Sequence, residues 1–261
     1  MSAAAVDAAA THGIALRAAD VRKVFGSGAD ATVALDGVDL DIKAGEFVTV
    51  VGASGCGKST LLNLFAGLDA PTSGTIWTAD KPALMFQEAT LLPWLTAQRN
   101  VELALKLHGV PRAERRERAK ELLRIVRLEG WEDKRPHELS GGMKQRVALA
   151  RCLAQDTSIV LMDEPLGALD AMTRDHLHDE IEAVVQEQGL TVVFVTHNMR
   201  EAVRLGDRVI LMGSRPGRIV YETTVDLPHP RLMDSAGVAE RAADLTVRLK
   251  AGRSHLEGAD S

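Results

Sequence analysis

The sequence predicts an α/β fold in which helices flank a mostly parallel sheet. Short apolar, β-branched runs alternate with stretches of helical periodicity along the 261-residue chain. This alternation favours parallel strands joined by right-handed crossovers. One of the runs leads directly into a glycine-rich loop and then into a helix. The composition, 46% hydrophobic and 26% charged, is typical of a soluble globular protein with a sizeable core.

The N-terminal part is expected to form a small antiparallel region ahead of the parallel sheet. Residues 1–13 are alanine-rich and poorly patterned, which indicates a disordered tail. Strand-like segments then cover residues 14–24 and 33–42, and a turn-rich stretch separates them. Phe25 ends the first segment, where its ring is either part of the core or exposed and able to stack on a purine base.

The later elements alternate between helical and strand patterns. After an edge strand at residues 75–78 and a short apolar run at 83–86, the periodicity from residue 96 to about 128 predicts two helices. The following elements are a helix at 141–155, a strand at 159–162, a helix at 170–188, a strand at 191–195, a helix at 198–205, strands at 208–212 and 218–221, and a helical stretch at 238–250.

Composition excludes some classes of function and location. Aromatic residues make up only 3% of the chain and the formal net charge is -5, so we expect no nucleic-acid partner. Two cysteines are too few for a disulfide framework and fit a reducing cytosol. No apolar stretch is long enough to cross a bilayer and the N-terminus lacks the features of a signal peptide. Any membrane role is therefore expected to act through a partner.

The glycine-rich loop matches the phosphate-binding pattern G-x-x-x-x-G-K-[ST] between a strand at residues 47–51 and a helix that starts near Lys58. Glycines let main-chain N–H groups turn inward, and the helix adds its positive dipole end. Lys58 supplies a charge for the β- and γ-phosphates, and the Ser59 hydroxyl is placed for Mg²⁺. The residues predicted to bind phosphates are Gly52, Ala53, Ser54, Gly55, Cys56, Gly57, Lys58, Ser59 and Thr60.

Two adjacent carboxylates follow the predicted strand at residues 159–162. A buried strand that ends in such a pair places one carboxylate near a bound metal ion and the next near the γ-phosphate. We expect Asp163 to contact Mg²⁺ through water, and Glu164 to be the general base that polarises the attacking water.

A second anion-binding helix start is predicted at Ser140, Gly141 and Gly142. Serine is a preferred N-cap residue, and the two glycines expose the first N–H groups of the helix. Because a chain with one phosphate loop has no evident use for two such sites, we expect this one to face the nucleotide of another copy.

The order of these motifs resembles the nucleotide-binding subunit of ABC transporters from residue 14 to residue 221. The family's parts match an aromatic residue at Phe25, Walker A at 52–60, the Q-loop at Gln87, the signature at 139–145, Walker B ending at Asp163, the catalytic carboxylate Glu164, the D-loop around 168–170, and the switch histidine His197. Met143 stands where the signature usually has glutamine, and Gly167 where the D-loop often has serine.

The resemblance implies the ABC ATPase fold, with a P-loop NTPase core, an N-terminal antiparallel β subdomain and a helical subdomain. The ATPase domain is expected over residues 14–225, its helical subdomain over about 88–157, and a short C-terminal extension over 226–261. In the family, two copies bind two ATP molecules head to tail. The resemblance also implies that Gln87 takes part in metal binding and in coupling to the membrane subunit, and that His197 contacts the γ-phosphate.

The implied function is ATP hydrolysis coupled to transport. Residues 86–94 and 214–219 look similar to importers for nitrate, sulfonates and taurine, so we expect an importer of a small anion. The implied cofactors and partners are ATP, Mg²⁺, a second copy in the ATP-bound state, permease subunits and, indirectly, a substrate-binding protein. The expected location is peripheral, at the cytoplasmic face of the inner membrane. The alternative is a soluble ABC-type ATPase that acts as a conformational switch on nucleic acid or ribosomes.

Overall fold

The computed structural model describes residues 13–167, 169–214 and 216–257 and divides into two compact units. The first unit combines the chain before residue 83 with the chain after residue 190, and the second covers residues 83–190. Each unit is described by itself. The predicted tail, apart from Gly13, and Ala168 of the predicted D-loop lie outside the described residues.

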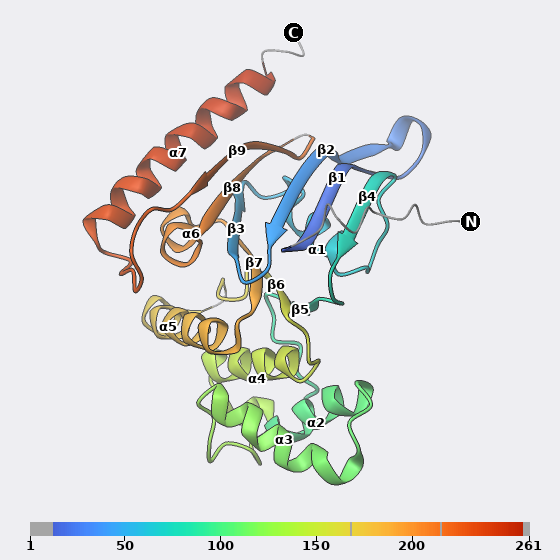
Figure 1. Ribbon diagram of the computed structural model, residues 1–261, viewed down its shortest axis with the longest axis vertical. Coiled ribbons are helices and arrows are strands. Elements are labelled where there is room, and N and C mark those ends of the chain that lie inside the picture. The colour runs from blue at the N-terminus through green and yellow to red at the C-terminus, as the bar shows by residue number, and fades with distance from the viewer. Residues whose placement is uncertain (1–12, 168, 215, 258–261) are drawn as a thin grey trace. The chain divides into compact units, whose positions relative to one another are not determined.

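An antiparallel sheet of three strands opens the first unit, as predicted. Its strand order is β2-β1-β4, and β1 pairs antiparallel with both neighbours (Figure 1). A single 3-10 turn, η2 (Gly28–Asp30), connects β1 to β2. The strands are β1 (Ile14–Phe25), β2 (Thr32–Lys43) and β4 (Ser73–Thr78).

The parallel strands of the first unit are β3 (Phe47–Gly52), β7 (Thr191–Thr196) and β8 (Arg208–Gly213). β3 lies between the other two and pairs parallel with both, while β9 (Arg218–Thr224) joins β8 antiparallel. Every residue of β3 and β7 is buried, which explains why both were recognisable as continuous apolar runs. The polar Thr49 is tolerated because its hydroxyl donates to the carbonyl oxygens of Ala202 and Arg208, at 3.2 and 3.3 Å.

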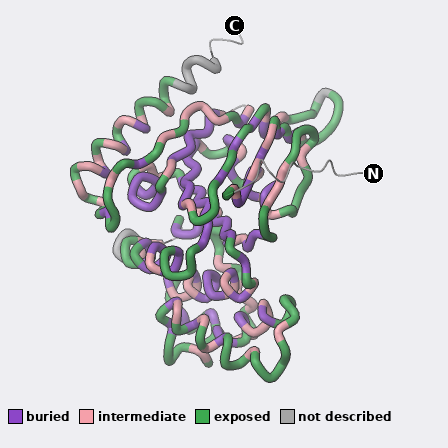
Figure 2. Tube along the Cα trace, viewed as in Figure 1, coloured by how far each residue is buried: buried purple, intermediate pink, exposed green. Residues whose placement is uncertain are grey.

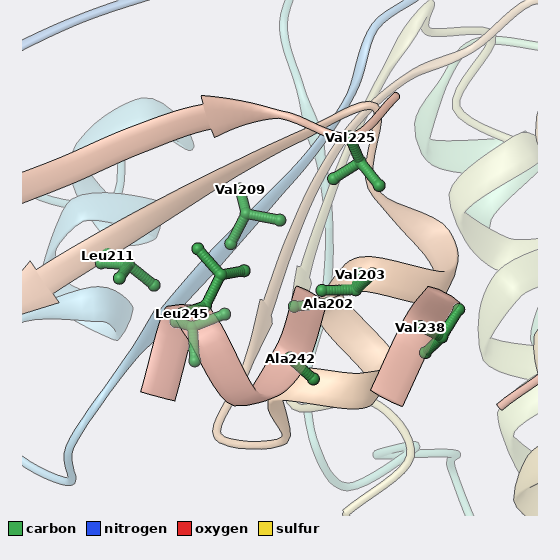
Figure 3. Close-up of a cluster of buried hydrophobic side chains, with 9 residues drawn as sticks. Ala202, Val203, Val209, Leu211, Val225, Val238, Ala242 and Leu245 are labelled. Atoms are coloured by element: carbon green, nitrogen blue, oxygen red, sulfur yellow. The ribbon is translucent and has the colours of Figure 1, made fainter. Parts of the chain in front are cut away.

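Three helices complete the first unit: α1 (Lys58–Phe65), α6 (Met199–Leu205) and α7 (Ala236–Glu257). The last helix packs against α6, β8 and β9. Figure 3 shows Val238, Ala242 and Leu245 of α7 in one buried cluster with valine and leucine side chains of β8. Their spacing places them on one helix face. The C-terminal helix therefore contributes core to this unit, and a domain boundary at residue 226 stays a prediction.

The second unit contains the predicted helical region. Its two strands, β5 (Ala83–Met85) and β6 (Ile159–Asp163), pair in parallel. α2, α3 and α4 pack against one another, and α4 also packs against β5. Burial follows this packing, since α4 is largely buried and α3 largely exposed (Figure 2). The helices are α2 (Ala97–Leu107), α3 (Arg112–Ile125), α4 (Gly141–Leu153) and α5 (Ala171–Gln188), with a 3-10 turn, η3 (Pro136–Glu138).

Side-chain caps fix where the helices of the second unit begin. Thr96 accepts a hydrogen bond from the backbone N–H of Arg99 at the start of α2. Asp170 does the same for Thr173 at the start of α5, at 3.0 Å. Such caps satisfy N–H groups that have no partner within the helix. In the described part of the chain, no helix combines the length and apolarity needed to cross a membrane.

A buried arginine ties the segment after β9 to the end of α6. Arg231 is only 5% exposed. Its guanidinium donates to the carbonyl oxygens of Val203, Gly206, Val225 and Leu227, at 2.8, 2.6, 3.1 and 3.0 Å. A buried charge of this kind is tolerated because its donors are satisfied. The arginine in turn satisfies carbonyl groups at the carboxyl end of a short helix.

We predict that Arg231→Met lowers the free energy of unfolding by about 3 kcal/mol, because it leaves several buried carbonyl groups without a donor. The matched control is Arg241→Met. Arg241 is only partly buried and donates to the carbonyl oxygen of Thr224, at 3.1 Å, so its loss should cost less than about 1 kcal/mol. Urea unfolding followed by circular dichroism measures both. Equal effects of the two substitutions would contradict the account of Arg231.

Candidate functional site

The glycine-rich loop joins the end of β3 to the start of α1, as the sequence predicts. A Cβ on Gly52 would lie 2.4 Å from Cys56 Sγ and 2.7 Å from the carbonyl oxygen of Met212. Gly57 has a φ of +95°, and a Cβ there would lie 2.6 Å from Leu35 Cδ2. Both positions therefore require glycine for packing, and Gly57 requires it for its backbone as well.

Lys58 lies over this loop rather than in solvent. Lys58 is the first residue of α1, and it is buried, with 6% exposure. Its Nζ donates to the carbonyl oxygens of Gly52 and Ala53, at 2.9 and 3.1 Å. The loop thus holds a desolvated cation at the amino end of a helix, where partial positive charge already favours anions. Ser59, next along α1, is exposed and presents a hydroxyl at the same end.

Cys56 is a packing residue of the loop. Its side chain is 0% exposed and lies under Gly52. Burial raises the pKa of the thiol, although Lys58 lies nearby and opposes the shift. Burial also raises the pKa of Cys152 to about 12. Both thiols are therefore held in the protonated form, in which sulfur is a poor nucleophile.

The loop faces a pocket of about 730 Å³ in the first unit, a volume ordinary for a small-molecule site. The predicted residues Gly55, Gly57, Lys58, Ser59 and Thr60 form one side. Two segments that the sequence analysis did not assign to the site form the rest. These are Ala31, Thr32, Val33, Ala34 and Asp36 around β2, and Pro216, Gly217 and Arg218 at the turn into β9.

Phe25 has an exposed ring, which resolves the two alternatives left by the sequence. The side chain is 46% exposed at the end of β1, and Lys23 Nζ lies 5.0 Å from the ring centroid. Among the described residues that line the pocket, Phe25 is absent. Its stacking on a base therefore stays a prediction.

His197 is exposed at a fixed corner between β7 and α6. Thr196 Oγ1 accepts from the backbone N–H of Asn198 at 3.0 Å and donates to the buried carboxylate of Glu201. Asn198 caps α6 by accepting from the backbone N–H of Arg200, at 3.0 Å. These bonds hold the backbone on both sides of the histidine, so its side chain projects from a rigid backbone.

Asp163 is the last residue of β6 in the second unit and Glu164 follows it; both are half-buried. Glu164 has a φ of 45°, a left-handed conformation that is uncommon for residues other than glycine. The backbone N–H of Gly167 donates to its carbonyl oxygen, at 3.0 Å. Strained backbone of this kind is concentrated at functional sites.

Gln87 lies beside the chain that follows Glu164. A Cβ on Gly167 would lie 3.1 Å from Gln87 Nε2, and the backbone carbonyl of Gln87 accepts a bond of 2.6 Å from Gln145 Nε2. Gln145 belongs to the predicted signature segment and is buried. The second unit therefore brings together the predicted Q-loop, the chain after the acidic pair, and α4.

The predicted second anion site is the exposed start of α4. Ser140 caps the helix by accepting from the backbone N–H of Met143, at 3.3 Å. Ser140 and Gly141 are exposed. A Cβ on Gly141 would lie 2.9 Å from Leu169 Cδ2, and one on Gly142 would lie 2.7 Å from Thr173 Cγ2. The glycines let this helix start pack against the chain that enters α5 while its tip stays accessible.

Comparison with known proteins identifies the family. A family model described as "ABC transporter" matches residues 35–167. A dimeric structure of the ATP-binding cassette MJ0796, described as a post-hydrolysis state bound to ADP and Pi, has a TM-score of 0.71 and 37% identity, and the match covers 82% of this chain and 100% of that one. The chain belongs to the ABC transporter ATP-binding family, and its fold is the predicted ABC ATPase fold.

Curated relatives cover most of the chain. An uncharacterized ABC transporter ATP-binding protein of Methanocaldococcus jannaschii is 46% identical over 84% of this chain and 85% of its own length. The taurine import ATP-binding protein TauB of Burkholderia pseudomallei is 45% identical over 81% of this chain and 84% of its own length. The nitrate import ATP-binding protein NrtD of Synechocystis sp. is 45% identical over 82% of this chain and 83% of its own length.

We predict that Gly57→Ala destabilises the protein by about 1–3 kcal/mol more than Gly55→Ala, because only the first adds a steric clash to the backbone strain. Gly55 has a φ of +76° with no atom within 4 Å of an added Cβ, so it is the matched control. Chemical denaturation of the two variants gives the difference. A Gly57→Ala variant as stable as Gly55→Ala would show that the loop is not confined as described.

Proposed function

We propose that the chain is the ATP-hydrolysing subunit that energises an ABC importer of a small anion. The main support for this proposal is the pocket at the phosphate loop, where the buried Lys58 ammonium lies at the amino end of α1. Membership of the ABC transporter family supports ATP as the ligand. The importer relatives support a small anionic cargo, either an aliphatic sulfonate such as taurine or a nitrate-type ion.

The first step is to hold the triphosphate. Backbone N–H groups of residues 52–60 and the Lys58 ammonium bind its β- and γ-phosphates. The residues that would hold Mg²⁺ are Ser59, Asp163 through water, and Gln87, whose side-chain oxygens are donors that suit this hard cation. When bound, the metal neutralises negative charge on the phosphate oxygens. Exposure of Ser59 at the helix start fits this assignment.

Hydrolysis requires a base and a contact to the γ-phosphate. Glu164 polarises the attacking water, and His197 contacts the γ-phosphate from the corner after β7. Two observations support these roles: the left-handed backbone of Glu164 and the hydrogen bonds that flank His197. Both side chains project from a defined backbone, which favours a fixed orientation toward the substrate.

A second copy completes each site. The exposed Ser140 and Gly141 tip of α4 binds the γ-phosphate of the ATP held by the other copy. The dimeric state of the MJ0796 cassette supports this arrangement. Because ATP then lies between two chains, binding favours the dimer and hydrolysis releases it.

The membrane partner is a permease at the cytoplasmic face, working with a substrate-binding protein. Phe86 and Trp94 flank the segment after Gln87 and are 44% and 67% exposed. Large exposed apolar side chains are frequent at protein interfaces. The alternative, a soluble switch on nucleic acid or ribosomes, is less well supported, because named relatives are import proteins.

Glu164→Gln tests the catalytic assignment. The amide cannot accept a proton, so ATP hydrolysis should fall about 100-fold or more while ATP still binds. The unhydrolysed nucleotide should then hold two copies together, and size-exclusion chromatography with saturating ATP should show a dimer. A variant that hydrolyses ATP at the wild-type rate, or that stays monomeric with ATP bound, contradicts the proposal.

Trp94→Ala tests the membrane role. Co-expressed with candidate permease subunits, the wild-type chain should purify as a membrane complex, and Trp94→Ala should reduce the yield of complex severalfold. Leu232→Ala is the control, because Leu232 is also exposed, at 68%, but belongs to the first unit. Failure of the wild-type chain to associate with any membrane protein would favour the soluble alternative. Uptake of taurine and of nitrate by the reconstituted complex distinguishes the two cargoes.

A further inference from the structure

The turn at residues 216–218 is hydrogen-bonded to β2 within the first unit. The backbone N–H of Gly217 donates to the carbonyl oxygen of Ala34 at 3.1 Å, and the N–H of Asp36 donates to the carbonyl oxygen of Gly217 at 3.0 Å. These two bonds form a parallel bridge between Leu35 and Gly217. The turn is therefore held at a fixed place beside the pocket.

The same turn touches the phosphate loop. A Cβ on Gly217 would lie 2.3 Å from the carbonyl oxygen of Cys56 and 2.7 Å from that of Ala34. A Cβ on Gly57, in the loop itself, would meet Leu35 and the same Ala34 carbonyl oxygen. Neither glycine leaves room for a side chain. The turn therefore packs directly against the loop and forms one wall of the pocket.

Arg218 brings a second cation to this pocket. Of the described residues that line it, the charged ones are Lys58, Arg218 and Asp36. Asp36 is shared between two guanidinium groups, because Arg218 Nη2 bonds to its Oδ2 and Arg22 Nε lies 3.4 Å from its Oδ1. The Arg218 side chain is 48% exposed. A guanidinium has five N–H donors, so one shared carboxylate leaves donors for a ligand.

We propose that Arg218 is a nucleotide-binding residue, which contacts the α-phosphate and ribose end of ATP. This inference rests on the proposed function. Lys58 and the loop take the β- and γ-phosphates, and residues of β2 together with Arg218 line the same pocket. We place the α-phosphate and ribose against these residues. Asp36 orients the guanidinium, and the bonds of Gly217 fix the backbone from which it projects.

Arg218→Gln should raise the dissociation constant for ADP about tenfold, the loss expected for one charge-assisted hydrogen bond. The KM for ATP should rise similarly while kcat stays within about twofold, because the contact is made equally in the ground and transition states. Arg218→Lys should recover part of the affinity, since it keeps the charge without the planar fork. Weakened salt dependence of ADP binding in Arg218→Gln would accompany loss of the phosphate contact.

Arg22→Gln is the matched control. Arg22 faces the same carboxylate, and it lines a neighbouring pocket that Asp36 and Arg218 also line, but it does not line the pocket at the loop. Its removal should leave ADP affinity unchanged. Unchanged affinity in Arg218→Gln, or an equal loss in Arg22→Gln, overturns the inference while the wild-type chain still binds ADP. A wild-type chain that binds no ADP overturns the proposed function, and the inference with it.

Discussion

The tight packing of the phosphate loop is the constraint on which the site depends. An added Cβ on Gly57 would lie within 3 Å of Leu35 and Ala34 in β2, and one on Gly217 would lie within 3 Å of the carbonyl oxygen of Cys56. This packing holds the loop whose carbonyl oxygens, at Gly52 and Ala53, accept hydrogen bonds from Lys58 Nζ. A buried cation held by backbone oxygens is ready to exchange them for phosphate oxygens, because its desolvation has already occurred. The antiparallel sheet therefore supports the loop, because its strand β2 packs directly against it.

The elements were predictable from the sequence because local patterns determine them. Continuous apolar runs identified β3 and β7, and the cap at Ser140 marked the start of α4. The walls of the pocket were not predictable, because the bond between Asp36 and Gly217 joins residues far apart in the chain and leaves no local pattern. Arg231 illustrates the same point, since a charged residue between two predicted elements gives no sign that it is buried.

The two units carry different parts of the proposed chemistry. The first holds the phosphate loop and His197, and the second holds Asp163, Glu164, Gln87 and the tip of α4. In the proposed function, the residues that act on the nucleotide therefore come from both units. The chain does not contact cargo in this account, which is consistent with equal identities of 45% to a taurine and a nitrate import protein.

In the proposed mechanism, the loop at residues 52–60 is half of a site that Ser140 of another copy completes. The most direct test mixes Lys58→Ala chains with Ser140→Arg chains, each inactive alone. Mixed dimers contain one intact site, formed by the loop of the second variant and the helix tip of the first. The account predicts that ATP hydrolysis returns on mixing, to at most about a quarter of the wild-type rate if the variants pair at random and the sites work independently. A mixture that remains as inactive as its components would contradict the claim.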